Sequence, residues 1–214
     1  MDTRISNNQF IDIFIKQCVC VLMNTTPQDE SRHVNQELDA NDIQQTLEGN
    51  NTAYARLVRR YEQAIASLMW RFTRDPNLLE ELVQDVFVEA YLHLKSFRSQ
   101  SPFYYWLRTI AYRCGYKYWK QLKRDRTLRE NFNKSGIETS TKIETPSQAA
   151  EILFRLLETL PVEERLILTL HYFEELQMDE IAERMGWTKT LVKVRAHRAR
   201  KKLKRKLEAF GLGQ

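Results

Sequence analysis

The chain has 214 residues, of which 43% are hydrophobic and 29% charged, and its formal net charge is +5. This length allows one large domain or two small ones, each with a modest core. Three cysteines and four histidines make neither a disulfide framework nor a zinc site. We therefore expect reduced thiols, as in a reducing cytoplasm, and no metal or cofactor.

Residues 1–41 are predicted to be an N-terminal extension that is poorly ordered. An apolar stretch within it is interrupted by Asp12 and Lys16 and is too short to span a bilayer. It also lacks a basic n-region and a small-residue cleavage site, so neither a signal peptide nor membrane insertion is expected. Met23 begins a polar run typical of a protein start. One hypothesis makes Met23 the initiator and residues 1–22 an extension without a fixed role, and the alternative is a start at Met1.

Residues 42–129 show helical periodicity almost throughout. Apolar residues recur at three- and four-residue steps in 57–72 and again in 78–94. Pro76 separates these two runs, and a turn cluster rich in Ser and Pro precedes a third helix over 103–129. No strand-like alternation appears. This block is predicted to be a small all-α domain.

The third helix of this block interleaves aromatic and basic residues. Rings can stack on unpaired bases while cations hold phosphates, so this composition favours single-stranded nucleic acid. The competing interpretation is that the rings only fill the core or pack on the linker. Trp106 and Ile110 define the face expected to be buried. The residues expected to contact nucleic acid are Tyr104, Tyr105, Arg108, Arg113, Lys117 and Lys120.

A polar segment, 130–148, follows this helix and is rich in Asn, Ser and Thr. It is predicted to be a flexible linker. Helical periodicity returns over 149–210, where Pro161 is expected at the first position of a helix. The chain is therefore predicted to be all-α, with two small helical domains joined by the linker.

The C-terminal block contains a pattern typical of a helix-turn-helix. Gly186 lies where the tight turn needs a positive φ, which glycine adopts without steric cost. Thr188 is expected to cap the second helix, and Ala182 is small enough for close packing of the two helices. From 184 to 206 the chain has many basic residues and no Asp or Glu. A merely solvated helix usually mixes charge signs, so this stretch favours binding to a phosphate backbone.

Both blocks together resemble the bacterial RNA polymerase sigma factors of the extracytoplasmic-function class, over about 42–207. The run Glu81-Leu82-Val83-Gln84-Asp85-Val86-Phe87 is similar to the Asp-Leu-Val-Gln-Glu-x-Phe run of the family's first domain. Residues 97–111 resemble the loop and helix that capture the non-template strand of the minus-ten element. The second-domain matches are Leu160-Pro161, Glu180-Ile181-Ala182, Gly186, Val192-Lys193, Arg195 and His197-Arg198-Ala199-Arg200.

The resemblance implies a binding module that itself makes and breaks no bond. Its partners would be core RNA polymerase, through the clamp helices of the largest subunit and the flap region, and promoter DNA, both duplex and single-stranded. An anti-sigma factor, which holds many relatives inactive, would be a further partner. Glu81, Gln84 and Asp85 would contact the clamp. Arg98, Ser99 and Gln100 would join the aromatic helix at the minus-ten element.

The second helix of the helix-turn-helix would lie in the major groove of the minus-thirty-five element. We expect its first turns to face base edges and the arginines that follow to grip phosphates. Lys202 and Lys204 lie beyond the recognition turns and are expected to contact phosphate only. The residues assigned to this element are Thr188, Lys189, Thr190, Lys193, Val194, Arg195, His197, Arg198 and Arg200.

The chain departs from the family pattern at a few positions. Arg113 and Lys117 stand where the family commonly has Asn and Asp, which makes this helix more basic. Glu175 replaces a frequent Gly, and Gln177 replaces the usual Ser or Thr cap. Each of these last two changes should cost up to ~1 kcal/mol locally.

Two other classes of protein were weighed against this interpretation. A conventional transcriptional regulator would bring a ligand-sensing or phosphoacceptor domain, and the first block lacks the α/β pattern of one. A DNA-processing enzyme would need a cluster of metal-binding carboxylates or an activated serine. Asp75, Asp85 and Asp125 fit helix-surface or turn positions better, so no catalytic residue and no metal ligand is assigned.

Overall fold

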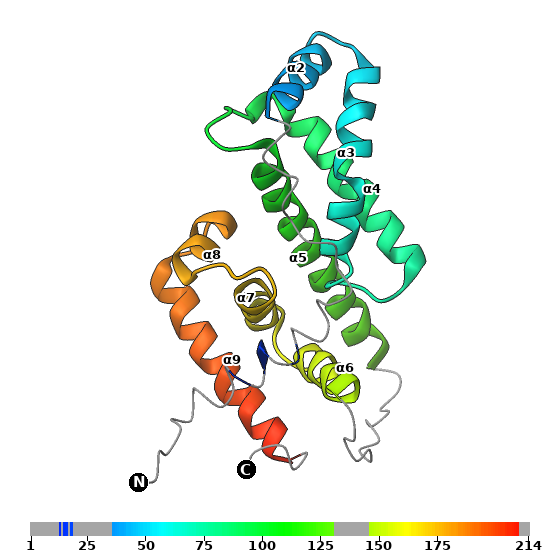
Figure 1. The fold of residues 1–214 in the computed structure, drawn as a ribbon. Coiled ribbons are helices and arrows are strands. Elements are labelled where there is room, and N and C mark those ends of the chain that lie inside the picture. Colours follow the sequence, from blue (N-terminus) through cyan, green and yellow to red (C-terminus); the bar gives the residue numbers. More distant parts are fainter. Residues whose placement is uncertain (1–12, 14, 17, 19–35, 131–145, 210–214) are drawn as a thin grey trace. The chain divides into compact units, whose positions relative to one another are not determined.

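The structure is a computed structural model, and it is helical, with no strand, over the residues that it describes (Figure 1). It describes residues 13, 15, 16, 18, 36–130 and 146–209, giving only the backbone for 127–130 and 146–150. The chain divides into two compact units. The first unit comprises residues 27–122, and the second unit comprises residues 1–26 with 123–214. The all-α, two-domain prediction is confirmed.

The first unit is built from helices whose starts are set by local sequence. They are α2 (Gln36–Leu47), α3 (Asn51–Met69), α4 (Pro76–His93), the 3-10 helix η2 (Leu94–Ser96) and most of α5 (Phe103–Glu130). The side chain of Asn50 accepts a hydrogen bond from the Thr52 N–H at 3.0 Å and caps α3. Asp75 caps α4 in the same way, with Pro76 as its first residue.

The core of the first unit lies between the apolar faces of α3, α4 and α5. The backbone of α5 comes close to the end of α3 at Gly115, where an added Cβ would lie 2.3 Å from the ring of Phe72. The Trp119 indole N–H donates to the Phe72 carbonyl oxygen at 2.8 Å, which fixes the same junction. The buried side chains include Leu57, Tyr61, Ile65, Leu68, Met69, Leu82, Val83, Val86, Phe87, Phe103, Leu107 and Tyr112.

Ion pairs hold α2 on α3. Arg60 donates to Asp42 at 2.7 Å and also pairs with Asp39, while Arg56 donates to Asp42 at 2.8 Å. The Tyr61 hydroxyl donates to Asp39. Burial raises the pKa of Asp39; at Asp42 the hydrogen bonds from the two arginines outweigh the opposing effect of burial and lower the pKa. Because both carboxylates are paired, α2 can bury them.

The predicted domain boundary at residue 42 therefore lies inside α2. This helix is polar, and its leucines Leu38 and Leu47 are exposed, so hydrophobic periodicity does not reveal it. Three of its four buried residues are the polar Asp39, Asp42 and Thr46. The attachment of α2 depends on charge pairing, which the sequence pattern did not predict.

The second unit contains a bundle of four helices. They are α6 (Pro146–Glu158), α7 (Val162–Tyr172), α8 (Met178–Met185) and α9 (Lys189–Ala209). Helix α6 begins at Pro146, inside the predicted linker 130–148, and residues 131–145 of that linker lie outside the described residues. Pro161 was predicted as the first helical residue, but it is the N-cap of α7, which begins one residue later at Val162.

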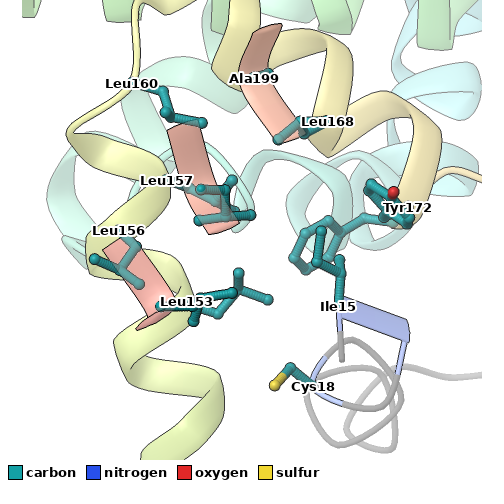
Figure 2. Close-up of a cluster of buried hydrophobic side chains, with 12 residues drawn as sticks. Ile15, Cys18, Leu153, Leu156, Leu157, Leu160, Leu168, Tyr172 and Ala199 are labelled. Atoms are coloured by element: carbon teal, nitrogen blue, oxygen red, sulfur yellow. The ribbon is translucent and has the colours of Figure 1, made fainter. Parts of the chain in front are cut away.

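A hydrophobic cluster fills the centre of the second unit, and it includes two side chains from near the N-terminus. Ile15 is 1% exposed and Cys18 is 4% exposed, and Figure 2 shows both facing the cluster. Both belong to the segment predicted to be an extension without a fixed role. The other members of the cluster are Leu153, Leu156, Leu157, Leu160, Leu168, Tyr172, Phe173, Ala199, Leu203 and Leu207.

Candidate nucleic-acid interfaces

Helices α8 and α9 form the predicted helix-turn-helix. Gly186 adopts a left-handed conformation with φ 69° and ψ 32° and ends α8, as predicted. An added Cβ at Gly186 would meet nothing within 4 Å, so the backbone conformation is what requires glycine there. The Thr188 hydroxyl accepts from the Leu191 N–H at 3.3 Å, which confirms the predicted cap. Ala182 and Val192 are buried between the two helices.

The outward face of α9 carries the residues assigned to base edges. Lys189, Thr190, Lys193, Val194 and His197 are all exposed. They recur at three- and four-residue steps and so share one side of the helix. The opposite side is buried and consists of small or apolar residues, namely Val192, Ala196, Ala199, Leu203 and Leu207.

The arginines assigned to phosphates differ in their surroundings. Arg198 is exposed. Arg195 lies over the ring of Trp187, at 5.4 Å from its centroid. The Nε of Arg200 donates to the Tyr172 hydroxyl at 2.9 Å. Two of the three guanidinium groups are therefore oriented by aromatic side chains of their own unit.

Three lysines of the second unit form ion pairs that bear on their expected roles, and one of them, Lys204, pairs with Glu208 at 3.5 Å. Lys202 donates to both carboxylate oxygens of Glu164 at 2.8 and 2.9 Å, and the Glu164 side chain is only 9% exposed. The expectation that Lys202 contacts phosphate stays a prediction, and the structure adds an ion pair between its ammonium and a nearly buried carboxylate. Lys189 pairs with Asp179 at 2.9 Å and is 67% exposed, and this contact lowers the pKa of Asp179.

The aromatic start of α5 has one exposed and one buried tyrosine. Tyr105 is 37% exposed, whereas Tyr104 is 5% exposed. The ring of Tyr104 stacks on Tyr61, with centroids 5.6 Å apart and planes 20° apart. Tyr104 is therefore a core residue in this structure, and the competing core interpretation holds for it. Tyr105, whose ring centroid is 6.0 Å from that of Tyr104, can meet a ligand.

The cations assigned to α5 lie mostly on the side of Tyr105. Arg113, Lys117 and Lys120 are exposed, and their spacing from Tyr105 places all four within one side of the helix. Arg108 is half-buried and donates to the Tyr112 hydroxyl at 2.9 Å, so it faces the core more than the other three do.

The loop between η2 and α5 carries the remaining residues assigned to the minus-ten element. Arg98, Ser99 and Gln100 are all exposed. Ser99 has a φ of 54°, a left-handed conformation that is uncommon for a residue with a side chain. The loop therefore presents polar groups beside the start of α5 on a constrained backbone.

Helix α4 presents a third surface. Glu81, Gln84 and Asp85, assigned to polymerase docking, are exposed together. The same side continues through Val88 and Leu92, which are 57% and 67% exposed. Sequence reasoning missed these two apolar residues. Both residues lie between the apolar positions of α4 that were predicted to form the core, and this offset could have identified them as exposed.

Two other kinds of site are absent from the part of the chain that the structure describes. Within the described residues, no group of three or more His, Cys, Asp or Glu side chains is arranged to hold a metal ion. In the same part of the chain, no helix has both the length and the apolar character needed to cross a membrane.

Two family models match the chain, in the predicted order. The model for Sigma-70 region 2 matches residues 57–125, and the model for Sigma-70 region 4 matches residues 150–203. The first match contains the exposed face of α4 and the start of α5. The second contains the helix-turn-helix.

Curated relatives match over most of their length. The ECF RNA polymerase sigma-E factor of Escherichia coli strain K12 is 30% identical over 177 residues, which is 78% of this chain and 92% of the relative. The sigma-E factor of Haemophilus influenzae is 29% identical over the same length and is covered to 93%.

Solved structures give a similar result. CnrH, determined in complex with the cytosolic domain of CnrY, is 25% identical with a TM-score of 0.51, and the match covers 82% of this chain and 97% of that one. The sigma factor RpoE of Bartonella quintana, in complex with the anti-sigma factor NepR, is 19% identical with a TM-score of 0.52. That match covers 72% of this chain and 96% of the other, and it supports the fold alone.

Proposed function

The chain belongs to the extracytoplasmic-function class of RNA polymerase sigma factors, and we propose that it directs core polymerase to promoters with two DNA elements. In this proposal the second unit reads the minus-thirty-five duplex and the first unit opens the minus-ten element. The observation that carries the proposal is the outward face of α9, where Lys189, Lys193 and His197 are exposed directly after the helix-turn-helix turn. The major groove is wide enough to admit such a helix.

Base readout at the minus-thirty-five element falls to the first turns of α9. Lysine ammonium groups can donate to guanine O6 and N7, so Lys189 and Lys193 suit base edges that carry acceptors. Val194 is 42% exposed, and an apolar side chain at this place suits the methyl group of thymine. This mixture of donor and methyl contacts supports sequence-dependent binding.

Phosphate contacts position α9 in the groove. Arg198 is exposed, and Arg195 and Arg200 are held by Trp187 and Tyr172. Guanidinium groups that are already oriented lose less side-chain entropy when they bind phosphate oxygens. These contacts fix the register of the helix and carry no base preference of their own.

Melting of the minus-ten element is assigned to the exposed side of α5. Tyr105 receives an unpaired base, while Arg113, Lys117 and Lys120 hold the strand that carries it. A base stacked on an aromatic ring contributes ~1–3 kcal/mol, which offsets the cost of unstacking. The exposed loop of Arg98, Ser99 and Gln100 adds polar contacts to the same strand.

Docking on core polymerase is assigned to the exposed face of α4. The carboxylates of Glu81 and Asp85 suit a basic surface, such as the clamp helices of the largest subunit. The apolar side chains of Val88 and Leu92 extend this face and favour burial in a protein interface. We assign contact with the flap region to the second unit.

The remaining assignments concern partners and setting. We propose that the protein acts in the cytoplasm and catalyses no reaction itself. An anti-sigma factor is a further proposed partner, since such a factor holds many members of this class inactive. Two weak DNA readers on one polymerase reinforce each other through effective concentration.

Run-off transcription with purified core polymerase tests the proposal. Templates selected from a library randomised upstream of the start should yield transcript only when the chain is added. Lys193→Ala and His197→Ala should change the upstream sequences selected, because both residues lie on the outward face of α9.

The matched control is Lys201→Ala, at an exposed lysine one turn beyond His197. It should weaken binding to every template alike and reduce the salt dependence. Failure of the intact chain to support any transcript would overturn the proposal. Equal losses on selected and scrambled templates for all three variants would show that α9 reads no bases.

A further inference from the structure

A short helical segment near the N-terminus contributes side chains to the second unit. Ile15 and Cys18 are buried in it, whereas Ile13 is 54% exposed and Lys16 is exposed. Positions 15 and 18 are three residues apart and share one side of a helix, and position 13 lies on the other side. The segment therefore has one side buried against the unit, with Ile15 and Cys18, and one exposed side, with Ile13 and Lys16.

The surface that receives this segment is made by α6, α7 and α9. Leu153 of α6 and Tyr172 of α7 stand with Ile15 and Cys18 in the same cluster (Figure 2). Ten of the twelve cluster residues lie between 153 and 207, so most of the cluster does not depend on the segment. Burial raises the pKa of the Cys18 thiol to about 11, and the neutral thiol behaves as a small apolar group.

This surface is separate from the DNA-facing side of α9. The cluster uses Ala199, Leu203 and Leu207, on the buried side and toward the end of the helix. The residues on the outward face, from Lys189 to His197, remain exposed with the segment in place. Occupation of the surface is therefore compatible with a free reading face.

We propose that α6, α7 and α9 form a helix-docking surface and that the N-terminal segment of this same chain that carries Ile15 and Cys18 is its reversible occupant. Residues 19–35 attach the segment covalently to α2, in the first unit. Such an attachment raises the local concentration of the segment to the order of millimolar, so two buried side chains suffice to hold it. When seated, the segment covers an apolar surface that would otherwise be exposed.

Peptide binding to the full-length chain tests this proposal. The probe is a fluorescein-labelled peptide of residues 1–22, kept reduced. The full-length Ile15→Asp variant should bind this peptide at least tenfold more tightly than the intact chain, because its own N-terminal segment no longer covers the surface made by α6, α7 and α9. The full-length Ile13→Asp variant is the matched control, since Ile13 is exposed, and it should bind no better than the intact chain.

A second peptide that carries Ile15→Asp should bind none of these chains. Equal binding of the first peptide by the intact chain and both variants would overturn the proposal, as would equal binding of both peptides. Circular dichroism of the Ile15→Asp variant decides the remaining case. Loss of its helical signal would show that the segment is an obligatory part of the core, and reversible docking would then be wrong.

Discussion

Helices α5 and α9 are alike in being long and basic, but they differ in which kinds of side chain they bury. Both were predicted to meet nucleic acid along one side. In α9 the buried side is made of small or apolar residues such as Ala196 and Ala199, and the polar residues face outward. In α5 the rings of Phe103, Tyr104, Tyr112 and Trp119 are buried, so half of its eight aromatic residues belong to the core.

The difference comes from what each helix packs against. Helix α5 lies against aromatic residues of α3 and of the turn after it, where Tyr61 of α3 stacks on Tyr104 and Phe72 of the turn contacts Trp119. Rings placed there gain more from mutual packing than from exposure. Helix α9 packs through short side chains, and Ala182 of α8 is likewise small and buried. A close approach of that kind leaves the longer side chains on the outside.

The largest expected effect separates the two tyrosines at the start of α5. Tyr104→Ala should lower the free energy of unfolding by about 3–5 kcal/mol, because it removes a buried ring. Tyr105→Ala should change it by less than about 1 kcal/mol. Urea denaturation followed by circular dichroism measures both. Similar losses for the two variants would contradict the division of α5 into a core side and a ligand side.

Promoter opening gives the complementary readout for the same pair. Tyr105→Ala should reduce permanganate reactivity of the minus-ten element on duplex templates. The reason is that one lost stack lowers the stability of the open complex by ~1–3 kcal/mol. A template already mismatched across this element should restore it, because no unstacking cost remains. A Tyr105→Ala defect that is equal on both templates would mean that the ring serves packing.

A smaller effect is expected among the lysines of α9. Lys202→Ala should destabilise the protein by about 1–2 kcal/mol, because it leaves the nearly buried Glu164 carboxylate without its ion pair. Lys201→Ala is the control, at an exposed neighbour, and should be within about 0.5 kcal/mol of the intact chain. Thermal unfolding at low and moderate salt distinguishes them. If Lys202→Ala causes no loss of stability, the ion pair with Glu164 contributes little, and phosphate contact is then the role expected of Lys202.

The smallest effect concerns backbone strain, which each unit carries at one place in its described residues. Ser99 of the first unit and Glu175 of the second have φ values of 54° and 55°. Glu175→Gly should stabilise the protein by about 0.5–1 kcal/mol, because glycine adopts this conformation without strain. Glu175→Ala keeps the strain and should give no gain. A gain from both substitutions would assign the effect to the Glu175 side chain.

Features that depend on local backbone chemistry could be predicted from the sequence. The turn at Gly186 and the cap at Thr188 follow from what those residues permit, and the structure has both. The replacement of a frequent glycine by Glu175 was noted, and its backbone is left-handed. Helical spacing also predicted the exposed face of α9, because a helix has a fixed period.

Features that depend on long-range pairing could not be predicted. Tyr104 and Tyr105 are adjacent and chemically identical, and the fold places the ring of Tyr104, not that of Tyr105, on Tyr61. The local sequence does not distinguish Lys202 from the lysines around it. Its difference arises from the ion pair with Glu164, which lies on another helix. Helix α2 carries little apolar periodicity, so its attachment through Asp39 and Asp42 gave no hydrophobic signal.

The length of α9 has a mechanical consequence. Its 21 residues form one continuous helix of about 32 Å at 1.5 Å per residue. Near its C-terminal end, Leu203 and Leu207 are buried and fix it on the unit. Because the helix is rigid, a change of packing around Leu207 would tilt it as a whole. In the proposed complex this would change the angle at which Lys189 and Lys193 meet the major groove. If α9 reads promoters as proposed, substitutions at Leu203 or Leu207, on its buried side, would change promoter choice without any contact to DNA.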